Sequence, residues 1–273
     1  MSFLDILVPV ISVTEDEPAL LAAETVASFA KGGVTALLLE VQPDPTYTYE
    51  AATIGTMWEE ILNRAQSQFA EDKALLDKRA ATHPMTTREL SILPGALERE
   101  LAAEARRADL TVLVRPGGSF VEGMRQTMYE GALFGSGRPV LVVPPTWKPG
   151  QLGRNVVVAW NGKREAARAL ADAAPFLERA DAVTVVTVGA VEPRDAITDV
   201  VAHLARRGIK AQARLIDDAG AGEADALMVE AAALNADLVV MGGYGRSRFR
   251  EFVFGGVTRE AITSAPLPLL MSH

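Results

Sequence analysis

The length, composition and charge of the chain exclude several classes of protein at the outset. Its 273 residues suffice for one large domain or two of modest size. With 49% hydrophobic and 23% charged residues, the chain can bury enough apolar surface to fold. The net charge of −8 argues against a nucleic-acid-binding surface, and the absence of cysteine excludes disulfides, thiolate metal sites and cysteine nucleophiles.

No segment has the pattern of a targeting or membrane sequence. The N-terminus lacks a basic region and is too short for a signal sequence. No apolar run approaches the roughly 18 residues of a membrane helix. We therefore predict a cytoplasmic protein without membrane contact. His83, His203 and His273 are far apart in the sequence, so neither a histidine metal site nor a catalytic triad is expected.

The first half, in chain order, alternates apolar runs with helical patterns. It opens with an apolar run at 4–10 that has the length of a buried strand. A proline-broken loop at 43–45 leads into a long amphipathic pattern over 47–80, which is typical either of a stripe facing the core or of a partner surface. The later predicted elements are a helix at 96–107 and strands at 108–114 and 140–143.

The second half continues the alternation after a linker at 144–150, where three prolines and a glycine stop any regular element. Its predicted strands are 156–160, 182–188, 209–216, 237–241 and 267–271, and its predicted helices are 164–179, 196–207, 223–234 and 257–263. Strands separated by helices of about 10 to 15 residues indicate βαβ units. The sequence thus predicts an α/β fold with a doubly wound parallel sheet, whose ligands bind beyond the carboxyl ends of the strands.

The two halves repeat one another. Residues 108–114 (ADLTVLV) recur as 236–242 (ADLVVMG), at an offset of 128 positions. Each copy follows an alanine-rich helical stretch and precedes a short strand introduced by proline. Because such self-similarity marks repeated structural units, we predict two domains, 1–145 and 151–273.

The most informative segment, 241–257 (MGGYGRSRFREFVFGGV), joins a buried strand to a helix. Glycines at a strand end permit positive φ and close approach of a ligand. Gly255 and Gly256 at a helix start leave N–H groups and the helix dipole for an anion. Three arginines add positive charge: Arg246, Arg248 and Arg250. The pattern indicates a phosphate site, although the glycines alone also fit turns and the arginines also fit a solvated loop paired with Glu251.

The common phosphate-binding motifs do not match. A Walker loop needs a glycine where Val157 stands and a hydroxyl where Arg164 stands. The segments 243–248 and 135–140 both lack the last glycine of the dinucleotide fingerprint. A P-loop ATPase and a Rossmann dehydrogenase are therefore disfavoured.

The spacing of Gly242, Gly245 and Gly255, with two and nine residues between them, resembles the ATP-binding signature of the universal stress proteins (UspA family). The surrounding segments 156–162, 164–170 and 236–242 are also similar to that family. The resemblance is strong over 151–273 and weak over 1–145. It implies a Rossmann-like, adenine nucleotide alpha hydrolase-like fold for both domains of a tandem protein.

The resemblance also implies a nucleotide site in the second domain. Residues that follow the first strand of this domain would contact the nucleoside, and the residue at the end of the second strand would contact adenine. Residues of the segment 241–257, called the glycine segment below, would contact the sugar and the phosphates. They are Ala159, Trp160, Asn161, Val188, Met241, Gly242, Gly243, Gly245, Arg246, Arg248, Gly255, Gly256, Val257 and Thr258. Lys163 and Arg164 either face the phosphates or are solvated.

Three positions depart from the family pattern. Asn161 replaces an acid, which keeps an acceptor and adds donors but weakens metal contact. Gly256 replaces a serine or threonine, so a hydroxyl donor is missing, and Arg248 replaces a small residue and would either clasp the triphosphate or crowd the loop.

The first domain has lost the glycine pattern. Gly117 corresponds to Gly245, but Val114 corresponds to Gly242, and no glycine pair appears at 126–131. A valine where positive φ or close ligand approach is needed would block the site. We therefore expect one nucleotide per chain, in the second domain, and a structural or partner-binding role for the first.

The leading functional hypothesis is a universal stress protein that binds ATP, with or without Mg²⁺, and regulates a stress response. No catalytic or metal-binding group is assigned, because Asp217 and Asp218 fit a solvated turn, so at most slow hydrolysis or autophosphorylation is expected. The alternative is a stress protein that binds no nucleotide and acts through protein contacts. An ATP-using ligase or adenylyltransferase ranks last, since 159–163 is not a serine- and glycine-rich loop.

The resemblance bears on assembly as well. In this family the last strands pair across a domain or subunit interface, so 140–143 and 267–271 are expected to pair within the chain, with Pro268 at an edge or unpaired position. A homodimer is compatible with the sequence but does not follow from it.

Overall fold

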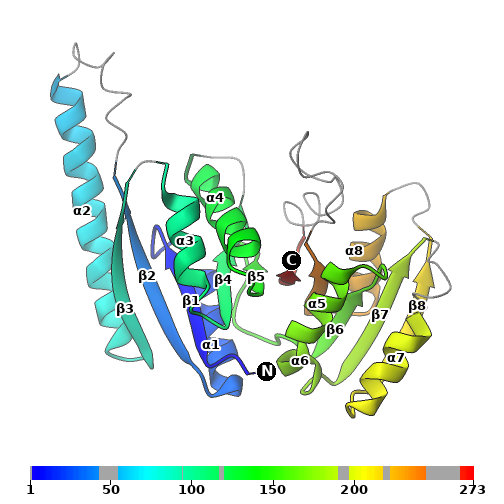
Figure 1. Cartoon of the computed structure of the whole chain (residues 1–273). Helices are drawn as coiled ribbons and strands as arrows, with labels where there is room; N and C mark the ends of the chain where they lie inside the picture. Colours follow the sequence, from blue (N-terminus) through cyan, green and yellow to red (C-terminus); the bar gives the residue numbers. More distant parts are fainter. Residues whose placement is uncertain are drawn as a thin grey trace.

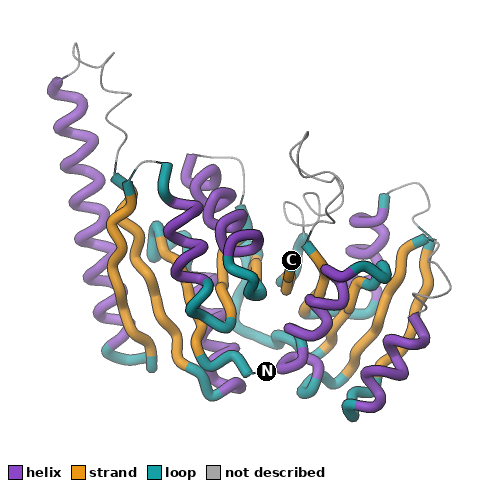
Figure 2. Tube along the Cα trace, in the orientation of Figure 1, coloured by secondary structure: helices purple, strands orange, loops and turns teal. Residues whose placement is uncertain are grey.

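The computed structural model describes residues 2–42, 55–93, 95–116, 120–189, 197–217, 222–243 and 265–273. The first half contains β1 (Asp5–Val10), α1 (Glu17–Ala30), β2 (Gly33–Val41), α2 (Gly55–Ala80), β3 (Met85–Ile92), α3 (Leu97–Ala105), β4 (Leu110–Val114), α4 (Phe120–Gly135) and β5 (Val140–Val143). The second half contains β6 (Asn155–Ala159), α5 (Arg164–Asp172), α6 (Ala174–Leu177), β7 (Ala182–Val188), α7 (Ile197–Arg206), β8 (Ala211–Ile216), α8 (Glu223–Ala233), β9 (Leu238–Gly242) and β10 (Leu269–Ser272). Figure 1 and Figure 2 show these elements.

All the described strands form one ten-stranded sheet in the order β3-β2-β1-β4-β5-β10-β9-β6-β7-β8. Each half has the same order, with its third, second, first, fourth and fifth strands side by side, and all pairs within a half are parallel. This arrangement confirms the predicted α/β, doubly wound fold. The halves meet where β5 and β10 pair antiparallel, with Val140 opposite Met271 and Val142 opposite Leu269, as expected for 140–143 and 267–271.

Helices cover both faces of the sheet and create two cores. Among the described residues, α1, α2, α5, α6 and α7 contribute to one core, and α3, α4 and α8 to the other. Successive strand residues alternate between the cores, as Ile6 and Val8 do on one side and Leu7 on the other. This alternation explains why the strands read as continuous apolar runs.

Each core extends across both halves. The ring of Phe176 in α6 lies 5.6 Å from the ring of Phe3 and 5.4 Å from that of Phe29 in α1. Phe3 and Phe176 are both fully buried. The helix predicted over 164–179 is interrupted at this point, because Pro175 has no N–H for the helix ladder and its ring clashes with the preceding turn. The resulting break separates α5 from α6.

The repeated Ala-Asp-Leu motif has a structural role. The carboxylate of Asp109 accepts the N–H groups of Leu4 and Asp5, at 2.9 and 3.1 Å. In the second half, Asp237 accepts the N–H groups of Arg154 and Asn155, at 3.0 and 3.2 Å. In both halves the aspartate therefore anchors the start of the first strand, at the edge of the sheet opposite the carboxyl ends of the strands.

Helix α2 occupies the place that α7 has in the second half, so the longer first half carries a lengthened helix and not an additional one. Its last turns pack on the sheet through buried Asp72 and Leu76 and through an Arg79–Glu24 ion pair. Ala65 and Gln68, which lie seven and four residues before Asp72 and so on the same face of the helix, are exposed. In Figure 1 the first turns of α2 extend past the neighbouring strands.

Within the described residues, no helix is long and apolar enough to cross a membrane.

Candidate functional site

The carboxyl ends of β6, β7 and β9 lie together at one edge of the second half. In register, Val158 of β6 lies opposite Val240 of β9, and Ala159 lies opposite Val186 of β7. The strand order reverses between β6 and β9, which is where ligands bind in sheets of this kind. The described residues of the predicted site are all at or next to this edge: Ala159, Trp160, Asn161, Val188, Met241, Gly242 and Gly243.

The backbone of Trp160 is fixed by the neighbouring strand. Its N–H donates to the carbonyl of Val186 at 2.8 Å, and its own carbonyl accepts the hydroxyl of Thr187 at 2.8 Å. Thr187 is buried. The Trp160 side chain is partly buried against the core, so both the backbone and the side chain of this residue are held in place at the edge.

Asn161 supports the start of helix α5. Its Oδ1 atom accepts the N–H of Lys163 at 3.1 Å, across Gly162, whose φ of 72° is the left-handed conformation that glycine tolerates best. Asparagine side chains stabilise turns in this way. The amide nitrogen of Asn161 donates no hydrogen bond within the described part of the chain, so the donor side of this exposed amide is available to a ligand.

Gly242 and Gly243 are required by packing. Neither has positive φ, so of the two reasons expected for glycine at a strand end, positive φ does not apply to these two residues. A Cβ atom on Gly242 would lie 2.6 Å from the carbonyl carbon of Glu165 in α5, and one on Gly243 would lie 2.8 Å from Cδ2 of Leu133 in α4. The strand end is thus held between a helix of its own half and a helix of the other half.

Glu165 is a buried acid that the sequence patterns did not single out. It lies in the first turn of α5 beside Gly242 and forms an ion pair with Arg164. Burial alone would raise the pKa of Glu165, but the hydrogen bond and charge of Arg164, the bond from its own N–H and the charge of His273 lower it below the ordinary 4.5. The signal in the sequence is only a glutamate near a helix start, where acids are common.

The two cations next to the edge, Lys163 and Arg164, differ in whether an acid pairs with them. Arg164 is engaged by Glu165, whereas Lys163 is exposed and has no ion-pair partner in the described part of the chain. Asp217, which was considered as a catalytic group for hydrolysis, is exposed after β8, as expected for a solvated turn residue.

Several predicted residues lie outside the described residues. They are Asp218 and the phosphate-side residues Gly245, Arg246, Arg248, Gly255, Gly256, Val257 and Thr258. The described residues contain no group of His, Cys, Asp and Glu that could hold a metal ion.

The strand end of β9 also contacts the end of the chain. The N–H of Gly243 donates to the carbonyl of Ser272 at 2.7 Å, and Nδ1 of His273 lies 2.9 Å from the carbonyl oxygen of Gly243. The His273 ring meets that of Phe134 in α4 edge-on at 5.1 Å. Helix α4 of the first half therefore braces the strand end from which the glycine segment departs.

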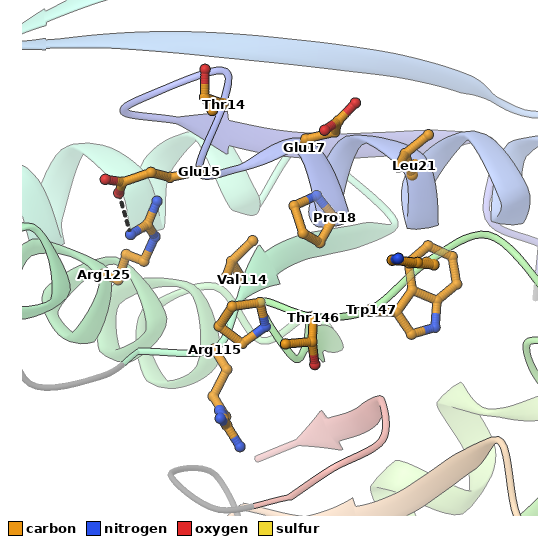
Figure 3. Close-up of a pocket in the computed structure, with 12 residues that line it drawn as sticks. Thr14, Glu15, Glu17, Pro18, Leu21, Val114, Arg115, Arg125, Thr146 and Trp147 are labelled. Carbon is orange, nitrogen blue, oxygen red and sulfur yellow. Dashed lines mark hydrogen bonds and ion pairs between the residues drawn. The ribbon is translucent and has the colours of Figure 1, made fainter.

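The corresponding edge of the first half is built differently. After β1, the N–H groups of Ile11 and Ser12 donate to one carboxylate oxygen of Asp16, at 2.8 and 3.2 Å, and the N–H of Val13 donates to Asp72 at 2.8 Å. These donors are therefore satisfied by the protein's own acids. Val114 is buried at the end of β4 and lines a cavity of about 480 Å³ that Figure 3 shows.

The chain is similar to universal stress proteins in sequence and fold. Residues 153–273 match the model of the Universal stress protein family. A universal stress protein from Archaeoglobus fulgidus DSM 4304 superposes with a TM-score of 0.71 at 16% identity, over 100% of this chain and 99% of that one. A candidate universal stress protein from Pseudomonas aeruginosa UCBPP-PA14 superposes with a TM-score of 0.60 at 15% identity, over 99% and 93%. No curated protein matches the sequence.

Proposed function

We propose that the chain binds one adenine nucleotide, ATP with or without Mg²⁺, in its second half and regulates a stress response. The premise of this proposal is the match of residues 153–273 to the Universal stress protein family. The supporting observation is the meeting of three strand ends beside the reversal in strand order, with the glycine segment leaving from one of them. The amide of Asn161 and the backbone at Val188 offer polar contacts to a nucleoside. Gly245, Gly255 and Gly256 are proposed to bind the phosphates through backbone N–H groups.

The charge distribution supports a single nucleotide per chain. In the first half, three N–H groups after β1 are used by Asp16 and Asp72. Glu15 and Glu17 add further negative charge to that loop. Because a triphosphate needs free donors and positive charge, the first half is the poorer site. The second half offers exposed Lys163 and the arginines of the glycine segment.

Nucleotide released from freshly purified protein by denaturation, identified by mass spectrometry, tests this proposal. Titration of the protein with ATP and Mg²⁺ gives the affinity, and Gly245→Val is expected to lower it at least about tenfold because the side chain obstructs the phosphates. The matched control is Gly117→Val, the repeat position in the first half, which should bind as the parent does. A parent that carries no nucleotide and has no measurable ATP affinity contradicts the proposal.

One observation favours the alternative, a stress protein that binds partners without nucleotide. The oxygen of Asn161 is committed to the turn before α5, and the buried charge of Glu165 lies beside Gly242. The first feature removes an acceptor that a ribose hydroxyl would use, and the second places a carboxylate beside the strand end, where it disfavours a phosphate. Under this alternative, Gly245→Val and the parent behave alike in the ATP titration.

We also propose that the protein is located in the cytoplasm. The absence of cysteine fits a reducing compartment. Phosphate release and incorporation of labelled phosphate measure whether ATP is hydrolysed or transferred to the protein. Sedimentation equilibrium with and without ATP measures whether the chain forms a homodimer.

A further inference from the structure

The two outer strands of the sheet, β3 and β8 (Figure 1), differ in how their open sides are protected. On β3, the carbonyl of Ile92 accepts an N–H of the segment after β2 at 2.9 Å, so the backbone groups of Ile92 face the sheet. Backbone groups alternate between the two sides of a strand, which places those of Thr87 and Glu89 on the open side. Helix α2 holds both side chains there, since Thr87 donates to Asp77 at 3.3 Å and Glu89 pairs with Lys73. Charged groups of this kind protect an outer strand from pairing with another chain.

The open side of β8 has no such protection. The carbonyl of Ile216 accepts the N–H of Gly189, which follows β7, at 2.8 Å, so the backbone groups of Ile216 face the sheet. By the same alternation, the N–H and carbonyl groups of Ala211, Ala213 and Leu215 are on the open side. No described strand pairs with them, and none of the three residues is charged. Strand β8 therefore offers free donors and acceptors to another strand.

The side chains of β8 are exposed as well as its backbone. Its four central residues are all exposed, and Leu215 is 68% exposed. Because side chains alternate between the faces of a sheet, Leu215 lies on the same face as Ala211, which packs partly against the core under α7. Arg214 lies on the other face and pairs with Glu230 of α8. A strand added beside β8 would cover Leu215.

The residues of β8 are suited to pairing with a second copy of the same strand. Two strands related by a two-fold axis perpendicular to the sheet are antiparallel. An axis at Ala213 places Ala213 opposite its own copy and Ala211 opposite Leu215 of the other copy. The open-side N–H and carbonyl groups of these three residues are then all paired. The small side chain of Ala211 also leaves room for Leu215 on the shared face.

The charges on β8 favour this register over its neighbours. With the axis at Ala213, Arg214 lies opposite Gln212, whose amide oxygen can accept an N–H that the ion pair with Glu230 leaves free. An axis one residue later would place Arg214 opposite its own copy, and an axis one residue earlier would place Lys210 opposite Arg214. Like charges directly opposite one another destabilise an antiparallel pair. Strand β8 is therefore complementary to itself in one register.

From these features we infer that two copies of the chain associate through antiparallel pairing of their β8 strands, so that one sheet continues into the other. The interface lies at the second-half end of the sheet, away from the pairing of β5 with β10 within the chain. Strand β3, at the other end, is not an interface, because α2 places charged side chains along it. The inference does not depend on nucleotide binding by the second half.

Sedimentation equilibrium of the full-length chain without nucleotide measures the association. We expect a dimer with a Kd of about 10 μM or lower. Ala213→Pro removes an open-side N–H and leaves the bonds to β7 in place, so it is expected to weaken dimerisation at least about tenfold. The matched control is Thr87→Pro, on the open side of β3, which should dimerise as the parent does. A parent that stays monomeric up to about 100 μM overturns the inference, as does equal dimerisation of Ala213→Pro and the parent.

A second variant separates loss of the interface from loss of the fold. Ala213→Asp keeps the backbone N–H and places two carboxylates opposite one another at the axis, so it should also weaken dimerisation about tenfold. Circular dichroism and urea unfolding show whether each variant is folded. A folded Ala213→Asp variant that dimerises as the parent does contradicts the inference, whatever the result for Ala213→Pro.

Single cysteines test the register, because the chain has no cysteine of its own. In Ala213→Cys the two sulfur atoms lie across the axis from one another, so oxidation with copper phenanthroline in air is expected to link the dimer through a disulfide. In Leu215→Cys the two cysteines are about four residues apart along the strands, roughly 14 Å, which is too far for a disulfide. Equal linking of both variants, or linking of Leu215→Cys alone, contradicts the proposed pairing.

Discussion

At the scale of single residues, close packing explains two glycines that look like ligand-binding residues in the sequence. Gly242 lies against the backbone of Glu165 and Ala166 in α5, and Gly243 lies against Leu133 in α4. A glycine that follows a buried strand therefore has two physical explanations, and the sequence does not distinguish them. Close packing here brings α5 near the strand end where the nucleoside is proposed to bind.

Gly242→Ala is expected to destabilise the protein by about 2 kcal/mol, since its Cβ would lie within 2.6 to 2.8 Å of α5 atoms and the backbone must shift. Urea unfolding followed by circular dichroism measures the loss. Gly33→Ala is the matched control, because no atom lies within 4 Å of the added Cβ. It should change the unfolding free energy by less than about 0.5 kcal/mol. Equal effects of the two variants would contradict the packing explanation.

Glu165 gives a prediction about pH. The pKa of Glu165 is lowered in the folded chain, so its carboxylate stabilises the fold above its ordinary pKa of 4.5, and this contribution disappears as the pH falls through the lowered value. Glu165→Gln should therefore cost about 1 kcal/mol at pH 7 and progressively less below about pH 4.5. Urea midpoints of parent and variant across this range provide the measurement. A difference that stays constant with pH would mean that ionisation of Glu165 does not contribute.

At the scale of elements, α4 links the first half to the glycine segment of the second. Leu133 contacts Gly243, and Phe134 contacts His273, which in turn lies against the Gly243 carbonyl. The hydroxyl of Tyr129 also lies 3.5 Å from the sulfur of Met271 in β10. The first half therefore positions the origin of the proposed phosphate loop, which is a structural role beyond that of a spare copy.

Leu133→Ala is expected to weaken ATP binding about three- to tenfold, because the strand end at Gly243, from which the proposed phosphate-binding segment continues, loses its support. Calorimetry gives the affinity. Leu101→Ala, a fully buried leucine of α3 in the same core, is the control for lost stability and should leave affinity unchanged. Equal losses of affinity in both variants would point to general destabilisation, and unchanged affinity in the Leu133 variant would remove the proposed role of α4.

At the scale of the whole molecule, the two halves pack together as one unit. One sheet runs through both, and each core contains side chains from both. Phe176 shows this coupling directly, since it belongs to the second half and its ring contacts those of Phe3 and Phe29 of the first. The proposed domain boundary at 145–151 is thus a boundary in chain connectivity and not in packing.

Phe176→Ala is expected to cost about 3 to 5 kcal/mol and to increase hydrogen exchange in β1 as well as in β6. Exchange measured by mass spectrometry resolves the two strands. Leu215→Ala, at a side chain that is 68% exposed on β8, serves as the control and should leave both strands protected. Faster exchange confined to the second half would contradict the coupling of the halves.

Much of the fold follows from local patterns in the sequence. Apolar runs of strand length, alternation with helices and the repeat at 108–114 and 236–242 are sufficient to predict a doubly wound α/β fold. The break between α5 and α6 is also encoded locally, since Pro175 cannot continue a helix, although the predicted helix at 164–179 ran through it. The exposure of Ala65 and Gln68 in α2 was not predictable, because amphipathic spacing does not say where the sheet beneath a helix ends.

The candidate site, like the fold, has features that the sequence predicts and features that it does not. The sequence by itself determined that glycines, Asn161 and Trp160 stand at strand ends, since strand ends and turn residues are local properties. Only the tertiary structure decided that Gly242 is needed for packing against α5, that Glu165 lies buried beside it, and that Val114 lines a cavity. Each of these depends on residues far apart in the chain, whose approach is set by how helices pack on the sheet, and that packing leaves no periodic trace in the sequence.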